Sequence, residues 1–332
     1  MDPTDLLNAA VERGDRRALA RLLRLVEDRR SGWEEVLGDA WKVSGNAHLI
    51  GLTGSPGSGK STLSDGLISA WRALDRQVGV VAVDPSSPFT GGALLGDRIR
   101  MQDHVGDAGV FVRSMSNRGR LGGVADATAG LVTVLDAAGF DPVVVETVGV
   151  GQSEVDVIDH ADTVVVVITP GSGDGVQADK AGVLEIADIF VINKADRPGA
   201  AEARRWLTAS LEMGPEREWT PPIVDTVAIE QTGVEELLDA LDLHRRHLMG
   251  DEGYRRRRRR AQAYVERAAA AEIRRRLDAT GLDDIVDQVV ARTLDPWKAA
   301  TLLGAGASPG AVIRGDTPHP GGPPSPHGDS GH

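Results

Sequence analysis

TGSPGSGKST, residues Thr53–Thr62, is a glycine-rich stretch that directly follows the apolar run HLIGL. It fits the pattern G-x-x-x-x-G-K-[ST], whose fixed positions are Gly54, Gly59, Lys60 and Ser61. Glycines let the backbone curl so that several N–H groups point at one phosphate, and a following helix, expected over residues 60–74, adds its positive N-terminus. The stretch therefore predicts a phosphate-binding loop between a strand and a helix.

The residue types of this loop predict how it holds a nucleotide. The Lys60 ammonium can reach the outer phosphates, which makes Lys60 a catalytic candidate, and the Ser61 hydroxyl can ligate Mg²⁺. The predicted nucleotide-binding residues of the loop are Gly54, Ser55, Pro56, Gly57, Ser58, Gly59, Lys60, Ser61 and Thr62. Phosphate binding alone does not distinguish ATP from GTP.

Composition narrows the class of protein. The 332 residues, 41% of them hydrophobic and 26% charged, are typical of a globular chain with one large or two modest domains. A net charge of −12 opposes nucleic acid as a partner, and no apolar run reaches the length of about eighteen residues needed to span a membrane. The chain has no cysteine and no recognisable targeting segment, so we expect a cytoplasmic protein without thiolate metal sites.

The apolar pattern along the chain predicts an α/β fold. Seven short apolar runs, separated by turns and helical stretches, predict strands of a doubly wound, mostly parallel sheet with both faces covered: HLIGLTG, QVGVVAVD, AGVFVRS, DPVVVET, DTVVVVITP, IADIFVINKAD and PPIVDTVAI. The expected organisation is a helical extension over 1–46, a P-loop G domain over 47–245, a helical segment over 246–303 and a disordered Gly/Pro/Ser-rich tail over 304–332.

The sequence NKAD, at the end of one of these apolar runs, predicts the base that the site reads. The Asp196 carboxylate can accept hydrogen bonds from the guanine ring N–H and exocyclic amine, whereas adenine would leave it unpaired, a discrimination of about 10⁴. Asn193 is expected to brace neighbouring loops, and the stem of Lys194 to cover the base. The backbone at Val227 and Ala228 is a further candidate contact to guanine. We therefore expect GTP or GDP.

Acidic residues near the predicted phosphates are candidate Mg²⁺ ligands. Glu146 is the fourth residue of the run VVVET, close to the end of the predicted strand, and the N–H of Gly149 could sense the γ-phosphate. Asp84 and Asp97 lie in the segment VAVDPSSPFTGGALLGDRIRM, and either could approach the metal beside Ser61 and Glu146.

The residue that positions the attacking water is harder to predict. Val150 follows Gly149 directly and cannot orient water, while Gln152 comes two residues later. We name Gly149 and Gln152 with Lys60 and Glu146 as catalytic candidates and expect slow intrinsic hydrolysis, about 10⁻⁴ to 10⁻² s⁻¹.

Together these blocks resemble the MeaB/ArgK family of P-loop GTPases, chaperones of methylmalonyl-CoA mutase and related acyl-CoA mutases. The resemblance rests on GLTGSPGSGKST, VAVDPSSPFTGGALLGDRIRM, AGFDPVVVETVGVGQSE and VQADKAGVLEIADIFVINKAD, and covers about residues 13–275. It implies a homodimer joined by a C-terminal dimerisation arm, and a GTPase that gates adenosylcobalamin loading, protects and reactivates the mutase, and contacts that cofactor only through the mutase.

The resemblance also implies a partner-responsive loop with Gln177, Asp179 and Lys180. Family members often carry two lysines in this loop, but here Ala181 follows Lys180. Three alternatives stay open at this stage: a metallochaperone for another metalloenzyme, which the lack of cysteine disfavours, a kinase, for which no second substrate pocket is recognisable, and a nucleotide-dependent scaffold with incidental turnover.

Two groups of arginines outside these motifs have a plain structural interpretation. The run Arg255–Arg260 is expected to lie on a solvated helix with its charge offset by nearby Asp and Glu, rather than to bind nucleic acid or lipid. One of Arg113, Arg118 and Arg120 could supply charge to a transition state, but a salt bridge is the simpler expectation.

Overall fold

A computed structural model shows how these elements are arranged. It describes residues 2–84, 104, 106–116, 123–147, 161–171, 185–215, 217–279 and 282–304. The chain forms two compact units, Met1–Val265 and Glu266–His332. The predicted nucleotide site belongs to the first unit.

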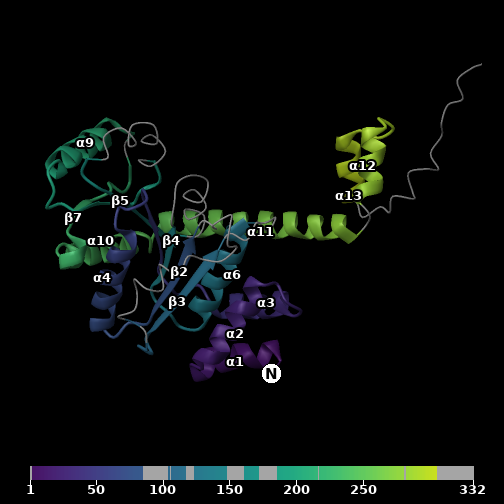
Figure 1. Ribbon diagram of the computed structural model, residues 1–332, viewed down its shortest axis with the longest axis horizontal. Helices are drawn as coiled ribbons and strands as arrows, with labels where there is room; N and C mark the ends of the chain where they lie inside the picture. The colour runs from purple at the N-terminus through teal and green to yellow at the C-terminus, as the bar shows by residue number, and fades with distance from the viewer. Residues whose placement is uncertain are drawn as a thin grey trace, which may run out of the picture. The chain divides into compact units, whose positions relative to one another are not determined.

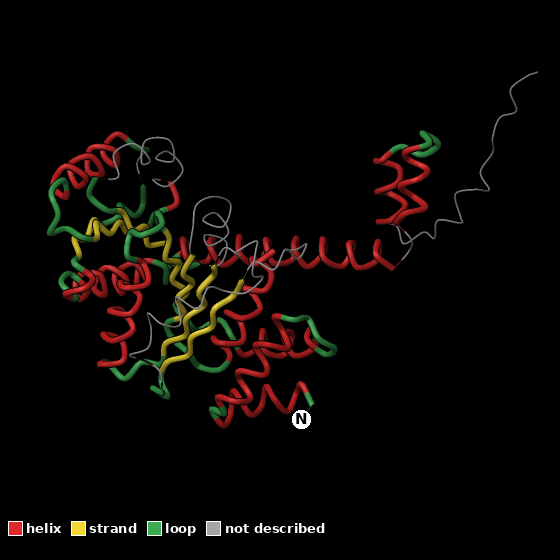
Figure 2. Tube along the Cα trace, in the orientation of Figure 1, coloured by secondary structure: helices red, strands yellow, loops and turns green. Residues whose placement is uncertain are grey.

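A seven-stranded parallel sheet forms the centre of the first unit (Figure 2). Its strands are β1 (Leu49–Thr53), β2 (Val78–Asp84), β3 (Val110–Ser116), β4 (Val143–Thr147), β5 (Thr163–Ile168), β6 (Ile189–Asn193) and β7 (Ile223–Thr226). The order across the sheet is β3-β2-β4-β1-β5-β6-β7, and every pairing is parallel. Each predicted apolar run became one strand, so the predicted fold class is confirmed.

The strands are apolar throughout because both faces of the sheet are buried. Val143 and Val145 of β4 pack into the core on one face, while Val144 between them packs into the core on the other. This alternation follows from the two-residue period of a strand, and continuous valine runs are what a sheet covered on both sides requires.

Helices cover both faces of the sheet (Figure 1). On one face lie α4 (Lys60–Ala73) and α10 (Val234–His247), whose leucines share a core with β1, β5 and β6. On the other face, α6 (Gly123–Ala137) packs over β2 and β4, and α9 (Ala200–Met213) packs over β5 and β6. The helix predicted over residues 60–74 is confirmed by α4.

Three helices at the N-terminus extend the layer that contains α6: α1 (Pro3–Arg13), α2 (Arg16–Glu27) and α3 (Trp33–Val43). Leu19, Leu22 and Leu23 of α2 are buried in the same core as α6. The Asp15 carboxylate begins α2 by accepting backbone N–H bonds from Arg17 and Ala18, as an N-cap does.

The C-terminal segment is helical as predicted: α11 (Asp251–Ala279), α12 (Leu282–Val290) and α13 (Pro296–Gly304). Within the second unit, α12 and α13 share a small core of Ile285, Leu294 and Ala299. Gly304 is the last residue of α13, and the rest of the predicted tail, residues 305–332, lies outside the described residues. Among the described helices, none has both the length and the apolar composition needed to cross a bilayer.

Candidate functional site

The glycine-rich loop leaves the carboxyl end of β1 and passes close to the end of β5. Gly54 has a φ of 142°, and a Cβ there would lie 2.1 Å from the carbonyl oxygen of Val167. Any larger residue would collide with backbone, which cannot move aside cheaply. The first glycine of the motif therefore sets the path of the loop across the sheet edge.

The second motif glycine brings the loop against the predicted guanine-reading segment. Gly59, the N-cap residue of α4, has a φ of 93°, and a Cβ there would lie 2.2 Å from Nδ2 of Asn193. Two sequence motifs that are far apart along the chain thus meet at one point of the sheet edge.

Lys60 lies inside the loop rather than in solvent. Only 5% of the residue is exposed, and its ammonium donates hydrogen bonds to the carbonyl oxygens of Gly54, at 2.5 Å, and Ser55, at 3.0 Å. The positive charge is therefore held next to the loop N–H groups that the sequence predicts to face phosphate.

Two predicted Mg²⁺ ligands are in direct contact. The Ser61 hydroxyl donates a 2.5 Å hydrogen bond to Oε1 of Glu146, which lies in β4 and is 1% exposed. Asp84 ends β2, the strand next to β4, so its backbone lies at the same edge of the sheet. An oxygen-only donor set suits a hard divalent cation, and the residues therefore fit Mg²⁺.

Asn193 joins three segments of the site. Its Nδ2 donates to the carbonyl oxygen of Ser58 at 2.8 Å, and its Oδ1 accepts from the Thr226 hydroxyl and the Ala228 N–H, each at 3.1 Å. The phosphate loop, the end of β6 and the turn after β7 are thereby tied together.

Two other residues of the NKAD segment, Lys194 and Asp196, differ in whether their side chains bond to the protein. Lys194 has a φ of 59° and donates from Nζ to the carbonyl oxygen of Gly57 at 2.8 Å, a second tie to the loop. Asp196 is exposed, and within the described part of the chain it makes no hydrogen bond or ion pair. Its acceptor oxygens are thus available in the way that base recognition requires.

The backbone N–H groups of Val227 and Ala228, which were predicted to contact guanine, already form hydrogen bonds within the protein. The Val227 N–H donates to the carbonyl oxygen of Thr232 at 3.1 Å, and the Ala228 N–H donates to Asn193. A contact from either N–H to guanine would have to share or replace these bonds.

Several other predicted residues fall outside the description. These are the side chain of Asp84 and all of Asp97, Gly149, Gln152, Gln177, Asp179 and Lys180. Arg113, considered for charge stabilisation, instead pairs with Glu27, as the simpler expectation had it.

A second polar cluster lies at the opposite, amino edge of the sheet, and sequence analysis did not find it. The Thr163 hydroxyl contacts Nε2 of His48 at 2.6 Å and Nδ1 of His244 at 2.7 Å. Nε2 of His244 faces Asp188 Oδ1 at 3.4 Å. A proton on that nitrogen suits the carboxylate, which makes Nδ1 the acceptor of the Thr163 O–H and His48 the donor to Thr163.

Burial keeps both histidines neutral. Desolvation lowers the pKa of His48 and of His244 from 6.5 to about 4 each, and the nearby carboxylates of Asp162 and Asp188 only partly oppose it. Neutral rings are the forms that the chain of hydrogen bonds uses, since each ring then offers one donor and one acceptor.

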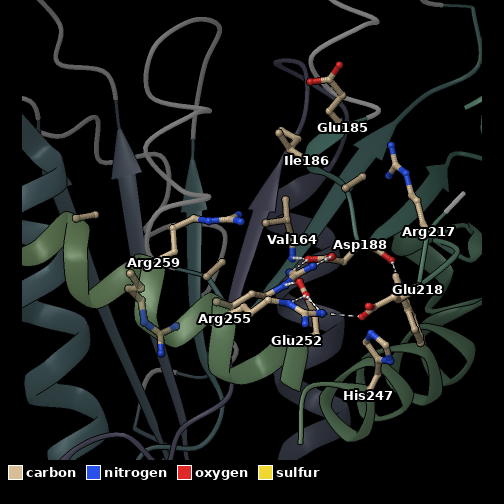
Figure 3. A pocket seen from close by; sticks show the side chains of 16 residues that line it. Val164, Glu185, Ile186, Asp188, Arg217, Glu218, His247, Glu252, Arg255 and Arg259 are labelled. Carbon is tan, nitrogen blue, oxygen red and sulfur yellow. Dashed lines mark hydrogen bonds and ion pairs between the residues drawn. The ribbon is translucent and has the colours of Figure 1, made fainter. Parts of the chain in front are cut away.

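Arginines of α11 close this cluster. Arg256 makes a two-pronged pair with Asp188, at 2.8 and 2.7 Å, and Arg260 bonds Asp162 at 2.6 Å. Burial lowers the pKa of Arg256, but the hydrogen bonds that its guanidinium donates to Asp188 and Glu252 outweigh this effect and hold the pKa above its ordinary value. Within the described part of the chain, the expected offset by Asp and Glu is found for three arginines of the run: Arg255 (Figure 3), Arg256 and Arg260. The last two also hold α11 on the sheet edge.

Comparison of the sequence with known proteins identifies the family of this chain. Residues 19–281 match the family model described as "Methylmalonyl Co-A mutase-associated GTPase MeaB". A "Putative GTPase" of Pyrococcus horikoshii is 47% identical over 91% of this chain and 98% of its own length. "GTPase ArgK" of Escherichia coli is 37% identical over 70% of this chain and 72% of its own.

Two further matches concern a fusion protein and a solved structure. "Fused isobutyryl-CoA mutase" of Cupriavidus metallidurans is 37% identical over 61% of this chain, a match that covers 19% of the longer protein. The crystal structure titled "LAO/AO transport system kinase" superposes with a TM-score of 0.68 and 26% identity, over 91% of this chain and 96% of that one.

Proposed function

The chain belongs to the MeaB family and is a P-loop GTPase, and from this premise we propose that its GTP hydrolysis gates delivery of adenosylcobalamin to an acyl-CoA mutase. One observation carries the nucleotide part of the proposal: the phosphate loop and the NKAD segment meet at Gly59 and Asn193. Phosphate-binding and base-reading groups thus share one sheet edge.

The mutase part of the proposal is supported by relatives. The description of the family names methylmalonyl-CoA mutase as an associate. A matching segment also makes up 19% of a protein named a fused isobutyryl-CoA mutase. A segment similar to this chain inside a protein named a mutase favours a mutase as the partner of this chain.

Different residues of the site would bind different parts of the nucleotide. The loop N–H groups and Lys60 would hold the β- and γ-phosphates, where developing charge is stabilised during transfer to water. The Asp196 carboxylate would accept from the guanine N–H and amine. Asn193 would act indirectly, by fixing the loop against the end of β6.

Mg²⁺ would neutralise phosphate charge when bound. Ser61 and Glu146 would hold it, with Asp84 and Asp97 as the further carboxylates of the set. The contact between Ser61 and Glu146 would keep both oxygens at the phosphate end of the loop.

The pace of hydrolysis would depend on the partner. Val150 stands where a water-orienting glutamine would follow Gly149, and Gln152 is the nearest substitute in the chain. Unassisted turnover would then be slow, about 10⁻⁴ to 10⁻² s⁻¹. Gln177, Asp179 and Lys180, in the segment that joins β5 to β6, would respond to the mutase.

A homodimer would form through the C-terminal arm, residues 246–303. The core shared by α12 and α13 is small, and Val290 and Trp297 of these helices are 76% and 80% exposed. Large exposed apolar side chains beside a small core favour a partner surface. Trp297→Lys should shift the protein from dimer to monomer in light scattering after size exclusion, whereas Lys298→Ala should not.

Loading of apo-mutase with adenosylcobalamin tests the gating proposal. The cofactor spectrum would be followed with the chain present and with GTP, GDP or a non-hydrolysable GTP analogue. A gate predicts that GTP supports loading and that the analogue slows it. Equal rates of loading with GTP and with the analogue would favour a scaffold. Equal rates of loading with and without this protein would reject the mutase as its partner.

A further inference from the structure

A cavity of about 700 Å³ lies at the amino edge of the sheet, where α11 meets β5 and β6. Its volume falls within the range of small-molecule sites. Val164 and Asp188, which line it, stand at the starts of β5 and β6, whereas the nucleotide site lies at the carboxyl ends of the strands. The cavity is therefore separate from the GTP site.

The charge of the cavity differs in sign from that of the chain. Five arginines and four carboxylates line it, in a protein whose net charge is −12. Arg255 pairs with Glu218 and Glu252, and Arg256 pairs with Asp188 and Glu252 (Figure 3). These pairs neutralise most of the lining carboxylates.

Arg259, which lines the cavity, has no carboxylate partner among the described residues. Arg259 is exposed, and its guanidinium makes no hydrogen bond or ion pair to any other residue that the structure describes. Glu185 also lines the cavity, but in Figure 3 its carboxylate points away from Arg255 and Arg259. A guanidinium without a carboxylate, beside neighbours that have one, is a ready ligand for an oxyanion.

Two further lining residues, Trp219 and His247, offer aromatic surface and a second polar atom. Trp219 is fixed by its indole N–H, which donates to the carbonyl oxygen of Asp188 at 2.8 Å, and it packs 5.2 Å from the ring of His247. Nε2 of His247 is buried and has no hydrogen-bond partner in the described part of the chain. A buried polar atom on a cavity wall without a protein partner is a candidate ligand contact.

We propose that this cavity binds a small organic anion, in which a phosphate or carboxylate faces Arg259 and a planar apolar body packs against Trp219 and His247. The proposal does not depend on the identity of the mutase or on GTP turnover.

Calorimetric titration of the full chain, saturated with Mg·GDP so that the phosphate loop is filled, tests the site. Phenyl phosphate and benzoate present the two oxyanions on the same ring, and inorganic phosphate lacks the ring. We expect one of the ring compounds to bind with a dissociation constant below about 1 mM, and more tightly than inorganic phosphate. Whichever ring compound binds more tightly identifies the preferred oxyanion.

Matched arginine variants decide whether the cavity is responsible. Arg259→Ala should weaken binding about tenfold or more, since a hydrogen-bonded charge is lost, and Arg259→Lys should weaken it less. Arg258→Ala removes the same charge from an exposed neighbour that does not line the cavity, and should change affinity less than about twofold. Absence of binding by both ring compounds, or equal losses in Arg259→Ala and Arg258→Ala, would overturn the proposal.

Discussion

The two edges of the parallel sheet are built in different ways. At the carboxyl edge, groups with ligand chemistry come from short motifs: Lys60 and Ser61 follow one glycine turn, and Asp196 follows one strand. At the amino edge, a series of side-chain contacts joins four separate segments, in the order His48, Thr163, His244 and Asp188.

Because of this difference, the carboxyl edge is suited to ligand binding and the amino edge to stabilising the fold. The carboxyl edge keeps Asp196 exposed, so that edge can accept a ligand. The amino edge holds Asp188 against Arg256, His244 and the Val164 N–H, so most of its polar groups are consumed internally. Changes at the first edge should alter nucleotide affinity, and changes at the second should alter the free energy of unfolding.

The largest expected effect is a change of base preference in Asp196→Asn. The substitution puts a donor where the exocyclic amine of guanine would donate, so the preference for GTP over XTP, about 10⁴ in the wild type, should be lost or reversed. Competition of GTP and XTP against a fluorescent GDP analogue measures it. Unchanged preference for GTP would remove Asp196 from the base-reading role.

Asp188→Ala should have the next largest effect, and on stability. It leaves Arg256 partly buried without its main partner, a change that costs about 3–5 kcal/mol of unfolding free energy. Glu185→Ala, which removes a carboxylate of the same cavity that has no partner among the described residues, should cost less than about 0.5 kcal/mol. Urea unfolding compares the two variants, and similar losses would contradict the role of Asp188.

Sequence could predict the carboxyl edge because its chemistry is local. The motif glycines, NKAD and the seven apolar runs each carry their signal within about ten residues, which is why the strands and α4 lie where the patterns predicted. Even there, the N–H groups of Val227 and Ala228 turned out to be engaged by Thr232 and Asn193, which no local pattern shows.

The amino edge could not be predicted, because its partners lie far apart along the chain. His48 and His244 are 196 positions apart and meet only through Thr163. The arginine run predicted a charged helix, but nothing local distinguishes Arg256, which is paired with Asp188, from exposed Arg258. Identifying such pairs requires the register of strands against α10 and α11.

Acidification should destabilise the amino edge through its neutral histidines. The pKa of His48 and of His244 falls from 6.5 to about 4 on folding, so the unfolded chain binds more protons between these values. Stability is then full above pH 6.5 and is lost as pH falls toward 4, by about 2 kcal/mol per histidine between pH 7 and pH 5. Urea unfolding at both pH values measures the loss, and His48→Gln should roughly halve it.

Lys60→Ala should weaken nucleotide binding while leaving the fold intact. Losing the charged hydrogen bonds to phosphate should reduce Mg·GTP affinity on the order of a hundredfold. Lys42→Ala, an exposed lysine of α3 that pairs with Asp39, serves as the control and should bind as the wild type does. Wild-type affinity in Lys60→Ala would exclude the loop as the phosphate site.

Steady-state GTP hydrolysis by the purified chain, alone and with an acyl-CoA mutase from the same source, shows whether a mutase controls this GTPase. We expect slow turnover alone, about 10⁻⁴ to 10⁻² s⁻¹, and strong acceleration when the mutase is added. Turnover that stays the same with the mutase present would contradict a GTPase gate that the mutase controls.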